Sequence, residues 1–158
     1  MALIPLEPLP GVIEFLNYLK KEKKNLLGLV TGNKENIGEK MIRKAGLYSY
    51  FSFFSFDRGE NREKLVESAI NKAEKIAPIK KKIVIGDTVH DIRAGKANSC
   101  FTVAVATGFS TMTTLQQEQP HLLLQSLKEY PSILKRISTT LTLSQNPQAE
   151  RAATASVR

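Results

Sequence analysis

The sequence has 158 residues, of which 42% are hydrophobic and 24% charged, a balance typical of one globular domain with a sizeable core. No run approaches the roughly 20 apolar residues that span a bilayer, and residues 1–12 lack the basic and apolar regions of a secretion signal. We therefore expect a cytoplasmic protein with no membrane segment. The single cysteine, Cys100, has no partner for an internal disulfide, and we interpret it as a small apolar residue rather than a reactive thiol.

The net charge of +8 raises the question of nucleic-acid binding, because clustered lysines and arginines can neutralise phosphates. The lysines fall in short groups at residues 20–24 and 80–82, and no aromatic residues lie among them as platforms for base stacking. We therefore interpret them as solvated ends of helices and strands, and we predict no nucleic-acid partner.

Helix and strand patterns alternate along the chain. Apolar residues at helical spacing predict helices, short apolar or aromatic runs predict strands, and Gly46 and Pro78 end two of the helices. In chain order we expect a helix from about residue 11 to the lysines at 20–24, a strand at 25–30, a helix through 37–45, a strand at 51–56, a helix at 62–77, a strand at 83–85, a helix through 92–97, a strand at 101–106, a helix at 111–118, a short edge strand at 121–124 and a helix at 127–137. Such alternation predicts an α/β fold with a parallel sheet covered on both faces.

The last 21 residues, 138–158, contain no aromatic residue and consist mainly of Ser, Thr, Ala and Gln. Such a composition cannot bury enough apolar surface to offset the entropy of ordering, so we expect a disordered tail. The folded domain is therefore predicted to cover residues 1–137.

Polar residues follow the first predicted strand. Thr31 leaves this strand with Gly32 and Asn33 behind it, so a hydroxyl and backbone N–H groups can face one point, as in a site for an oxyanion. The same residues also fit an ordinary turn before a helix, and the pattern alone leaves both interpretations open.

Two carboxylates follow the strand at 83–85. Asp87 ends this strand and Asp91 lies about one helical turn later, so both can project into one crevice at the carboxyl end of the sheet. Two close carboxylates repel unless a cation neutralises them, and Mg²⁺ takes oxygen ligands of this kind. Alternatively, Asp87 caps the following helix and Asp91 only complements the helix dipole.

A basic residue at the start of the third predicted helix, Arg62 or Lys64, could neutralise a bound phosphate, although either could be an exposed charge on an amphipathic helix. His90 and His121 show no pattern of partners, and we interpret both as surface residues.

Five segments taken together resemble one known family. In chain order, LPGVIEFLNYL, LVTGNK, ENREKLVESAINKA, IVIGDTVHDIRAGKAN and VAVATGFSTMTTLQQEQPHLLLQSL resemble the haloacid dehalogenase (HAD) superfamily of phosphohydrolases, over about residues 8–130. The GDTxxDIxAG run followed by a VATG strand is the most specific part. The resemblance implies a Rossmann-like core and a Mg²⁺-dependent phosphatase, of phosphoglycolate-phosphatase-like type, acting on a small phosphorylated metabolite.

The resemblance also implies roles for the candidate residues. Thr31, with Gly32 and Asn33, would bind the phosphoryl group, and Asp87 would ligate Mg²⁺. Arg62 or Lys64 would steady the nucleophile and the phosphate, and Arg62 fits better by its distance from the following helix. Asp91 would support the metal site or hold the basic residue.

The sequence departs from the family at its beginning. Members open with a strand bearing DxDxT, whose first aspartate attacks phosphorus, and usually follow it with a helical cap that chooses the substrate. This sequence shows neither, and its remaining aspartate, Asp57, lies in the wrong place for a nucleophile. We therefore expect an incomplete chain that is inactive alone, and a separate N-terminal segment that supplies DxDxT.

The missing strand has a structural consequence. In the family it lies between the strands that here end at Thr31 and Asp87. Because neighbouring strands lie about 4.8 Å apart, its loss leaves these two either roughly 9–10 Å apart with unpaired backbone groups or forced into new pairing. The alternative function is a non-catalytic remnant of the family that binds phosphate or a protein.

Overall fold

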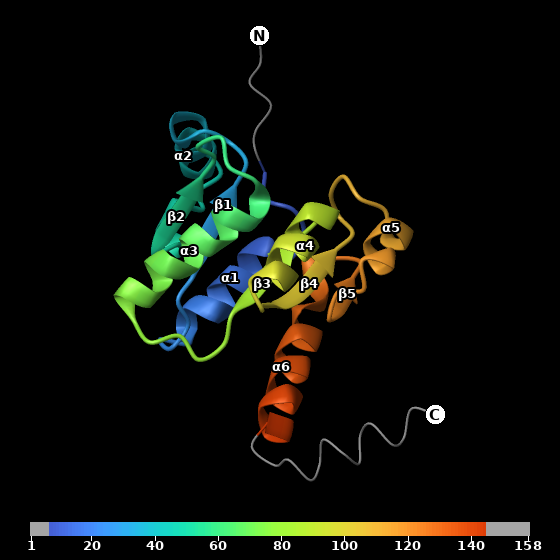
Figure 1. The fold of residues 1–158 in the computed structure, drawn as a ribbon. Helices are drawn as coiled ribbons and strands as arrows, with labels where there is room; N and C mark the ends of the chain where they lie inside the picture. The colour runs from blue at the N-terminus through green and yellow to red at the C-terminus, as the bar shows by residue number, and fades with distance from the viewer. Residues whose placement is uncertain (1–6, 145–158) are drawn as a thin grey trace.

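The computed structural model describes residues 7–144 and contains alternating helices and strands (Figure 1). The strands are β1 (Gly28–Thr31), β2 (Phe53–Phe56), β3 (Ile83–Gly86), β4 (Phe101–Val105) and β5 (Leu122–Leu124). The helices are α1 (Val12–Lys21), α2 (Glu35–Lys44), α3 (Arg62–Ile76), α4 (Val89–Ala97), α5 (Met112–Gln117) and α6 (Tyr130–Ser144), with short 3₁₀ turns η1 (Tyr48–Tyr50) and η2 (Leu127–Glu129). The predicted alternation is confirmed, and only η1 lacks a counterpart in the sequence prediction.

All strand pairs among the described residues are parallel, as predicted, but they form two separate sheets. One sheet contains β1 and β2, with Gly28 opposite Phe53 and Thr31 opposite Phe56. The other has the order β3-β4-β5, with Ile83 opposite Phe101. The sequence left two possibilities for the strands that end at Thr31 and Asp87: a gap between them or direct pairing. Because β1 and β3 belong to different sheets, they do not pair with each other in the described residues.

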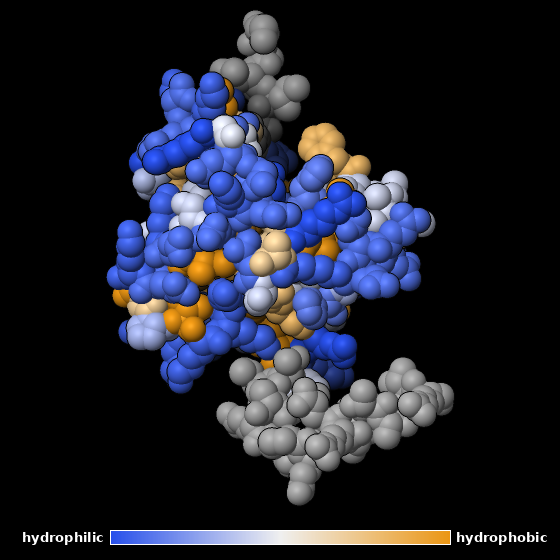
Figure 2. All heavy atoms as spheres, in the orientation of Figure 1, coloured by the Kyte–Doolittle hydropathy of each residue, from blue (hydrophilic) through white to orange (hydrophobic). Residues whose placement is uncertain are grey.

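Two helices link the sheets on one side. α3 contacts β1 and β2 and also packs along α4, which covers β3 and β4. A small core of Val66, Ala94 and Cys100 lies between these helices, and both Val30 of β1 and Val84 of β3 pack against it. Charged and polar side chains cover most of the face that carries α3 and α4 (Figure 2). The two sheets are therefore held beside each other by side-chain packing.

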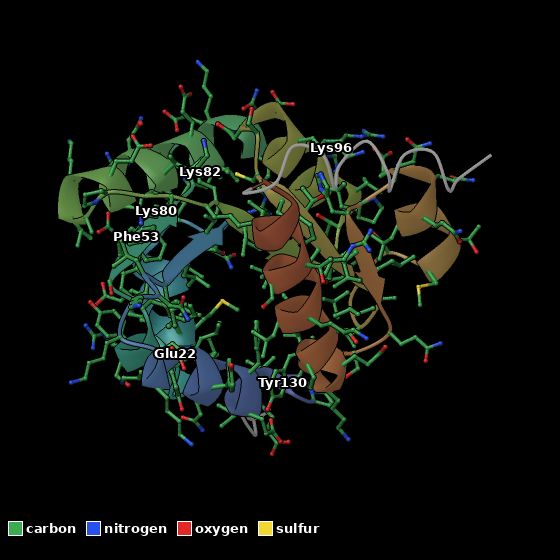
Figure 3. All side chains as sticks on the ribbon, turned by 90° about the horizontal axis from the view of Figure 1, so that it is seen from below. Glu22, Phe53, Lys80, Lys82, Lys96 and Tyr130 are labelled. Atoms are coloured by element: carbon green, nitrogen blue, oxygen red, sulfur yellow. The ribbon has the colours of Figure 1, made fainter. Side chains whose placement is uncertain are left out.

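The main core lies on the other face of the β3-β4-β5 sheet. Its buried members are Phe15 of α1, Ile133 of α6, and Val103, Val105 and Leu124 of the sheet. At the start of α6, Tyr130 stacks on Phe15 with ring centroids 5.4 Å apart, close to α1 in Figure 3.

The turn before α1 requires a glycine. Gly11 has a φ of 87°, a conformation that favours glycine, and a side chain there would collide with the backbone of Leu127 and Lys128 in η2. This close approach fixes α1 against the start of the last helical segment.

The last helix is longer than predicted. The domain was expected to end at residue 137, with a disordered tail at 138–158, but α6 continues to Ser144. The hydroxyls of Ser138 and Thr139 donate to the carbonyl oxygens of Leu134 and Lys135 one turn earlier, at 2.9 and 3.0 Å. Extending an anchored helix costs less than starting one, so polar residues can continue it. The rest of the predicted tail, 145–158, lies outside the described residues.

Two further predictions can be compared with the structure. Cys100 is buried, with 4% of its surface exposed. His121 is exposed, as predicted, but it is not without partners: its Nδ1 accepts the backbone N–H of Thr102 at 3.0 Å and lies 2.8 Å from the Thr102 hydroxyl. Because 19 residues separate Thr102 and His121 in the chain, no local sequence pattern predicted this contact. Among residues 7–144, no helix is long and apolar enough to cross a membrane.

Candidate active site

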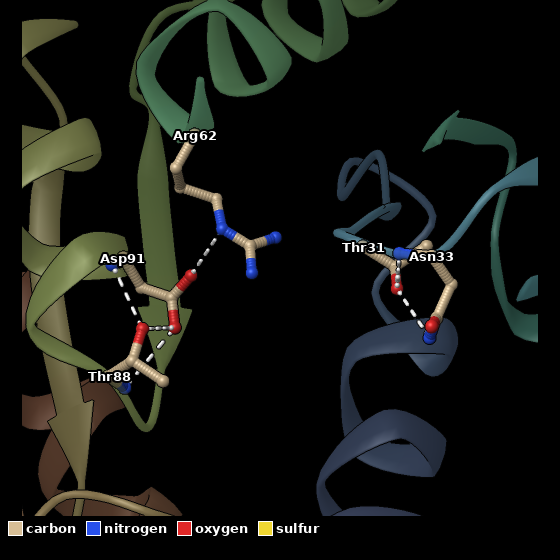
Figure 4. A network of polar contacts seen from close by, with 5 residues as sticks. All are labelled: Thr31, Asn33, Arg62, Thr88 and Asp91. Atoms are coloured by element: carbon tan, nitrogen blue, oxygen red, sulfur yellow. Dashed lines mark hydrogen bonds and ion pairs between the residues drawn. The ribbon is translucent and has the colours of Figure 1, made fainter. Parts of the chain in front are cut away.

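The predicted site residues lie at the carboxyl ends of β1 and β3, where parallel strands lead into helices. Thr31 is the last residue of β1, and Asp87 directly follows the last residue of β3. Figure 4 shows Thr31 and Asn33 on one side of this region and Asp91 on the other, with the Arg62 side chain reaching from α3 into the space between. The site therefore belongs to both sheets.

The Thr31 hydroxyl is held by the turn that follows it. Its Oγ1 accepts both the backbone N–H and the side-chain amide of Asn33, each at 3.2 Å. Thr31 is partly buried, whereas Gly32 and Asn33 are exposed. The turn thus keeps the hydroxyl at the end of β1, where its own proton can still be donated to an anion.

Asp91 is held at the start of α4. The N-terminal cap of this helix is Thr88, so the alternative that Asp87 caps the helix is wrong. The backbone N–H of Asp91 donates to Thr88 Oγ1, while Asp91 Oδ2 accepts the Thr88 hydroxyl at 2.7 Å and the Thr88 backbone N–H at 3.2 Å. This reciprocal capping box fixes the carboxylate of Asp91.

The other oxygen of Asp91 faces Arg62. Arg62 Nε lies 3.3 Å from Asp91 Oδ1, and both side chains are largely buried, with 27% and 17% of their surfaces exposed. The guanidinium also reaches the turn after β1, because a Cβ built on Gly32 would lie 3.6 Å from its terminal nitrogen. The Arg62 guanidinium therefore lies close both to Asp91, after β3, and to the turn that follows β1.

The structure separates the two basic candidates. Lys64 is exposed, and it lines a surface hollow between α3 and the end of β2 with Glu60 and Glu67. Its backbone N–H donates to Asn61, the cap of α3, at 2.9 Å. Arg62, not Lys64, is the residue that the fold brings to Asp91.

Asp87 lies partly buried beside the loop that follows β4. A side chain at Gly108 would collide with its carboxylate, so the backbone of this loop packs directly on Asp87. Among residues 7–144, no hydrogen bond or ion pair engages the Asp87 carboxylate. This group is therefore available to a cation or a ligand.

The residues present can supply part of a Mg²⁺ site. No cluster of three or more carboxylates, histidines or cysteines suited to a metal occurs among the described residues, and Asp91 already binds Thr88 and Arg62. Mg²⁺ is commonly held by one or two carboxylates with water and substrate phosphate completing its shell. The Asp87 carboxylate fits that arrangement as one ligand.

Sequence reasoning missed three residues that shape the site: Thr88, Gly86 and Gly108. The Thr88-Val-His-Asp91 spacing is a capping-box pattern and could have identified Thr88. Gly86 faces Asp91 and Gly108 faces Asp87. Sequence alone gave no signal for these two contacts, because each depends on how a neighbouring loop or helix packs.

Neither Asp57 nor His90 was predicted to belong to the site. Asp57 follows β2 and accepts the backbone N–H of Gly59 at 2.8 Å within its own loop. His90 is exposed on the first turn of α4.

The family model for haloacid dehalogenase-like hydrolases matches residues 4–105. The chain belongs to this family. A curated phosphoglycolate phosphatase of Neisseria meningitidis is 28% identical over 108 residues, which are 65% of this chain and 46% of that protein. A phosphoglycolate phosphatase of Nitrosococcus oceani is 26% identical over 130 residues, 80% of this chain and 57% of that protein.

Solved structures of the family share the fold. A haloacid dehalogenase-like hydrolase of Streptococcus pneumoniae is 19% identical, with a TM-score of 0.68 over 79% of this chain and 59% of that one. The β-phosphoglucomutase of Pyrococcus sp. strain ST 04 is 26% identical, with a TM-score of 0.67 over 82% and 56%. The chain spans about half the length of the curated relatives it matches.

Proposed function

We propose that this chain is the core of a Mg²⁺-dependent phosphatase that hydrolyses the phosphate monoester of a small cytoplasmic metabolite. The observation that carries the proposal is the Arg62–Asp91 pair at the carboxyl ends of β1 and β3, beside the Thr31 turn, in a chain of the haloacid dehalogenase-like family. A fixed positive charge beside a hydroxyl that a tight turn holds in place suits a phosphoryl group.

Each residue has a distinct part in this proposal. Thr31 donates its hydroxyl proton to a phosphoryl oxygen, the backbone N–H of Gly32 adds a second donor, and Asn33 holds the Thr31 hydroxyl in place. Arg62 neutralises charge on the phosphoryl oxygens, and Asp91 positions Arg62 through its fixed carboxylate. Such preorganised charges stabilise a transition state because they need no rearrangement during the reaction.

Asp87 is the proposed metal ligand. Mg²⁺ bound there would neutralise phosphate charge and polarise the phosphoryl group. The Asp87 carboxylate suits this role because it lies at the end of β3 and has no other partner among residues 7–144.

The nucleophile is the part that these residues do not supply. The aspartates of the chain are Asp57, Asp87 and Asp91; the first lies in its own loop and the last is bound to Thr88 and Arg62. Covalent phosphoryl transfer needs a carboxylate free to attack. We propose that a segment carrying DxDxT supplies it, and that residues 7–144 alone do not turn over substrate.

A second candidate function is a non-catalytic module that binds phosphate or a protein. The engagement of Asp91 by two partners favours it, because Asp87 is then the one uncommitted aspartate at the described site. Such a module would bind inorganic phosphate through Arg62 and Thr31 without hydrolysis.

The test is a fusion that places a DxDxT segment and a helical cap before residue 8. We expect it to hydrolyse p-nitrophenyl phosphate with Mg²⁺, and Asp87→Asn to lower turnover on the order of 100-fold, because a neutral amide holds the cation poorly. Arg62→Ala should weaken activity much more than Lys64→Ala.

His90→Ala is the control, since His90 is exposed on the same helix as Asp91. Full activity of Asp87→Asn in a folded, active fusion would show that Asp87 is not a metal ligand. A folded fusion that binds phosphate but never hydrolyses the ester would favour the non-catalytic module.

A further inference from the structure

Basic side chains gather at the amino-terminal end of the β3-β4-β5 sheet, the end opposite the candidate active site. Lys81 lies just before β3, His121 just before β5, and Lys96 in the last turn of α4. We call these three residues the Lys81 cluster. Because a strand rises about 3.3 Å per residue, the stretch from Lys81 to Asp87 places roughly 15–20 Å between this cluster and the candidate active site.

Lys81 has a buried charge without a hydrogen-bond acceptor. Its Nζ makes no hydrogen bond with residues 7–144, although the atom is shielded from solvent. It lies 5.4 Å from the centre of the Phe101 ring, which offers a cation–π contact but no acceptor oxygen. A buried ammonium without an acceptor costs free energy, and the lysine stem is flexible enough to turn toward a ligand. An anion at this point would therefore be favourable.

His121 brings a second donor to the same place. Its Nδ1 accepts the backbone N–H of Thr102 at 3.0 Å, so the neutral ring carries its proton on Nε2. The ring is exposed, and no hydrogen bond within residues 7–144 engages Nε2. His121 stacks on Phe101 with ring centroids 4.8 Å apart. Since Phe101 contacts both His121 and Lys81, the two donors lie close together.

The lysines of the cluster have no carboxylate partner among the described residues. Lys96 Nζ donates to the backbone carbonyl oxygen of Glu118 at 2.5 Å. The carboxylate of Glu118 is already bound by Arg93. The ion pairs of residues 7–144 involve neither Lys81 nor Lys96. Their charges are therefore not neutralised by the described part of the chain.

The charges that act on His121 come from three elements. After desolvation of the ring, the charges of Lys96 in α4, Arg136 in α6 and Lys81 before β3 lower the pKa of His121, and no carboxylate of the described residues offsets them. The electrostatic potential at this end of the sheet is therefore positive. A bound anion would raise the pKa of His121 again, because it favours the protonated ring.

We propose that Lys81, Lys96 and the Nε2–H group of His121 form a binding site for a phosphate-type oxyanion, either free phosphate or the phosphate group of a small metabolite. A tetrahedral oxyanion presents acceptor oxygens in several directions, and hydrogen bonds from charged donors to it are strong. The site is independent of the proposed phosphatase activity, because it lies at the other end of the sheet and shares no residue with the candidate active site.

The experiment titrates the 158-residue chain with sodium sulfate and follows the imidazole NMR signals of His121, with the ionic strength held constant by sodium chloride. Sulfate is the probe because it stays divalent over the whole pH range in which histidine titrates. We expect a saturable shift of the Nε2 signal and a higher pKa of His121 with sulfate. Sulfate should therefore bind more tightly as the pH falls through that pKa.

Lys81→Met tests the residue on which the site depends, because it removes the ammonium and keeps an apolar stem. It should weaken sulfate binding at least about tenfold, the loss expected for a hydrogen bond from a charged donor. Lys80→Met removes the same charge from the exposed neighbouring residue and should change the affinity less than about twofold. Urea midpoints of both variants, close to that of the wild-type chain, verify that they are folded.

Arg62→Ala separates this site from the candidate active site, and it should leave the sulfate-induced shift of His121 unchanged. Three results would overturn the proposal: no saturable shift of His121, equal losses of affinity in Lys80→Met and Lys81→Met, or a shift that Arg62→Ala abolishes and Lys81→Met retains.

Inorganic phosphate and glycerol 3-phosphate distinguish the two sources of the oxyanion. Tighter binding of glycerol 3-phosphate would assign the site to a phosphorylated metabolite. Equal or tighter binding of inorganic phosphate would assign it to the free anion.

Discussion

At the scale of single residues, the site depends on carboxylates that are held by different means. Asp91 is fixed by Thr88 and Arg62, whereas Asp87 has no such partner among residues 7–144 and is confined by the backbone at Gly108. Asp91 is therefore suited to holding the Arg62 side chain, and Asp87 is suited to binding a ligand.

Substitution of the two neighbouring glycines tests this difference. In Gly108→Ala the new methyl would collide with the Asp87 carboxylate and would lie 2.8 Å from Asp87 Cβ, which side-chain rotation does not move, so we expect unfolding to become about 1–3 kcal/mol easier and Mg²⁺ binding by the DxDxT fusion to weaken. In Gly86→Ala the methyl would lie 2.5 Å from Asp91 Cγ and Oδ2, which cannot move without breaking the cap, so unfolding should become about 1–3 kcal/mol easier.

Urea denaturation and isothermal titration with Mg²⁺ measure these effects. Unchanged Mg²⁺ affinity of a folded Gly108→Ala fusion would contradict the assignment of Asp87.

At the scale of elements, the short edge strand β5 is held to β4 by backbone pairing and also by a side-chain hydrogen bond from the residue that precedes it, His121. His121 stacks on Phe101 with ring centroids 4.8 Å apart, and its Nδ1 accepts the backbone N–H of Thr102. Desolvation of the imidazole ring, followed by the charges of Lys96, Arg136 and Lys81, lowers the pKa of His121 from its ordinary value. The neutral ring is therefore the form that the folded chain prefers.

The lowered pKa of His121 predicts the sign of a pH effect. Because the unfolded chain binds this proton more readily, the stabilisation is complete above the ordinary histidine pKa of about 6.5 and is lost as pH falls toward the lower folded value. Urea midpoints at pH 7.5 and 5.5 should differ more for the wild-type chain than for His121→Asn, whose amide oxygen can still accept an N–H.

His90→Asn is the matched control on the other, exposed histidine. An equal pH dependence in the His121→Asn and wild-type chains would show that His121 does not couple stability to pH.

At the scale of the whole molecule, the parts are joined by packing rather than by one continuous sheet. The β1-β2 unit contacts the rest through α3 and α4, while α1 and α6 close the other face of the β3-β4-β5 sheet. The candidate site is accordingly assembled from residues that follow strands of both sheets.

The contribution of α6 to this architecture can be measured. Ile133 is 1% exposed within the core that joins α6 to α1 and the sheet, so Ile133→Ala should lower the free energy of unfolding by about 2–5 kcal/mol. The exposed neighbour Lys135, changed to Ala, should alter it by less than about 0.5 kcal/mol. Similar urea midpoints for the two variants would show that α6 does not anchor this core.

Sequence periodicity was enough to predict the order and type of nearly every element, because helical and strand periodicities are local. It also identified the family and indicated Thr31, Asp87, Asp91 and Arg62 as candidates, since these lie in short motifs at the ends of predicted strands. The length of α6 was misjudged, because composition does not show that a helix anchored at Ile133 can continue through Ser138 and Thr139.

Contacts between distant segments could be assigned only from the three-dimensional structure. The choice of Arg62 over Lys64 depends on which face of α3 meets α4, and the packing of Gly108 on Asp87 depends on the path of the loop after β4. The partners of His121 and the packing of Val30 and Val84 against one cluster likewise arise from long-range packing. Local patterns encode how a segment folds, whereas the position of one segment against another depends on side chains that meet only when the chain is compact.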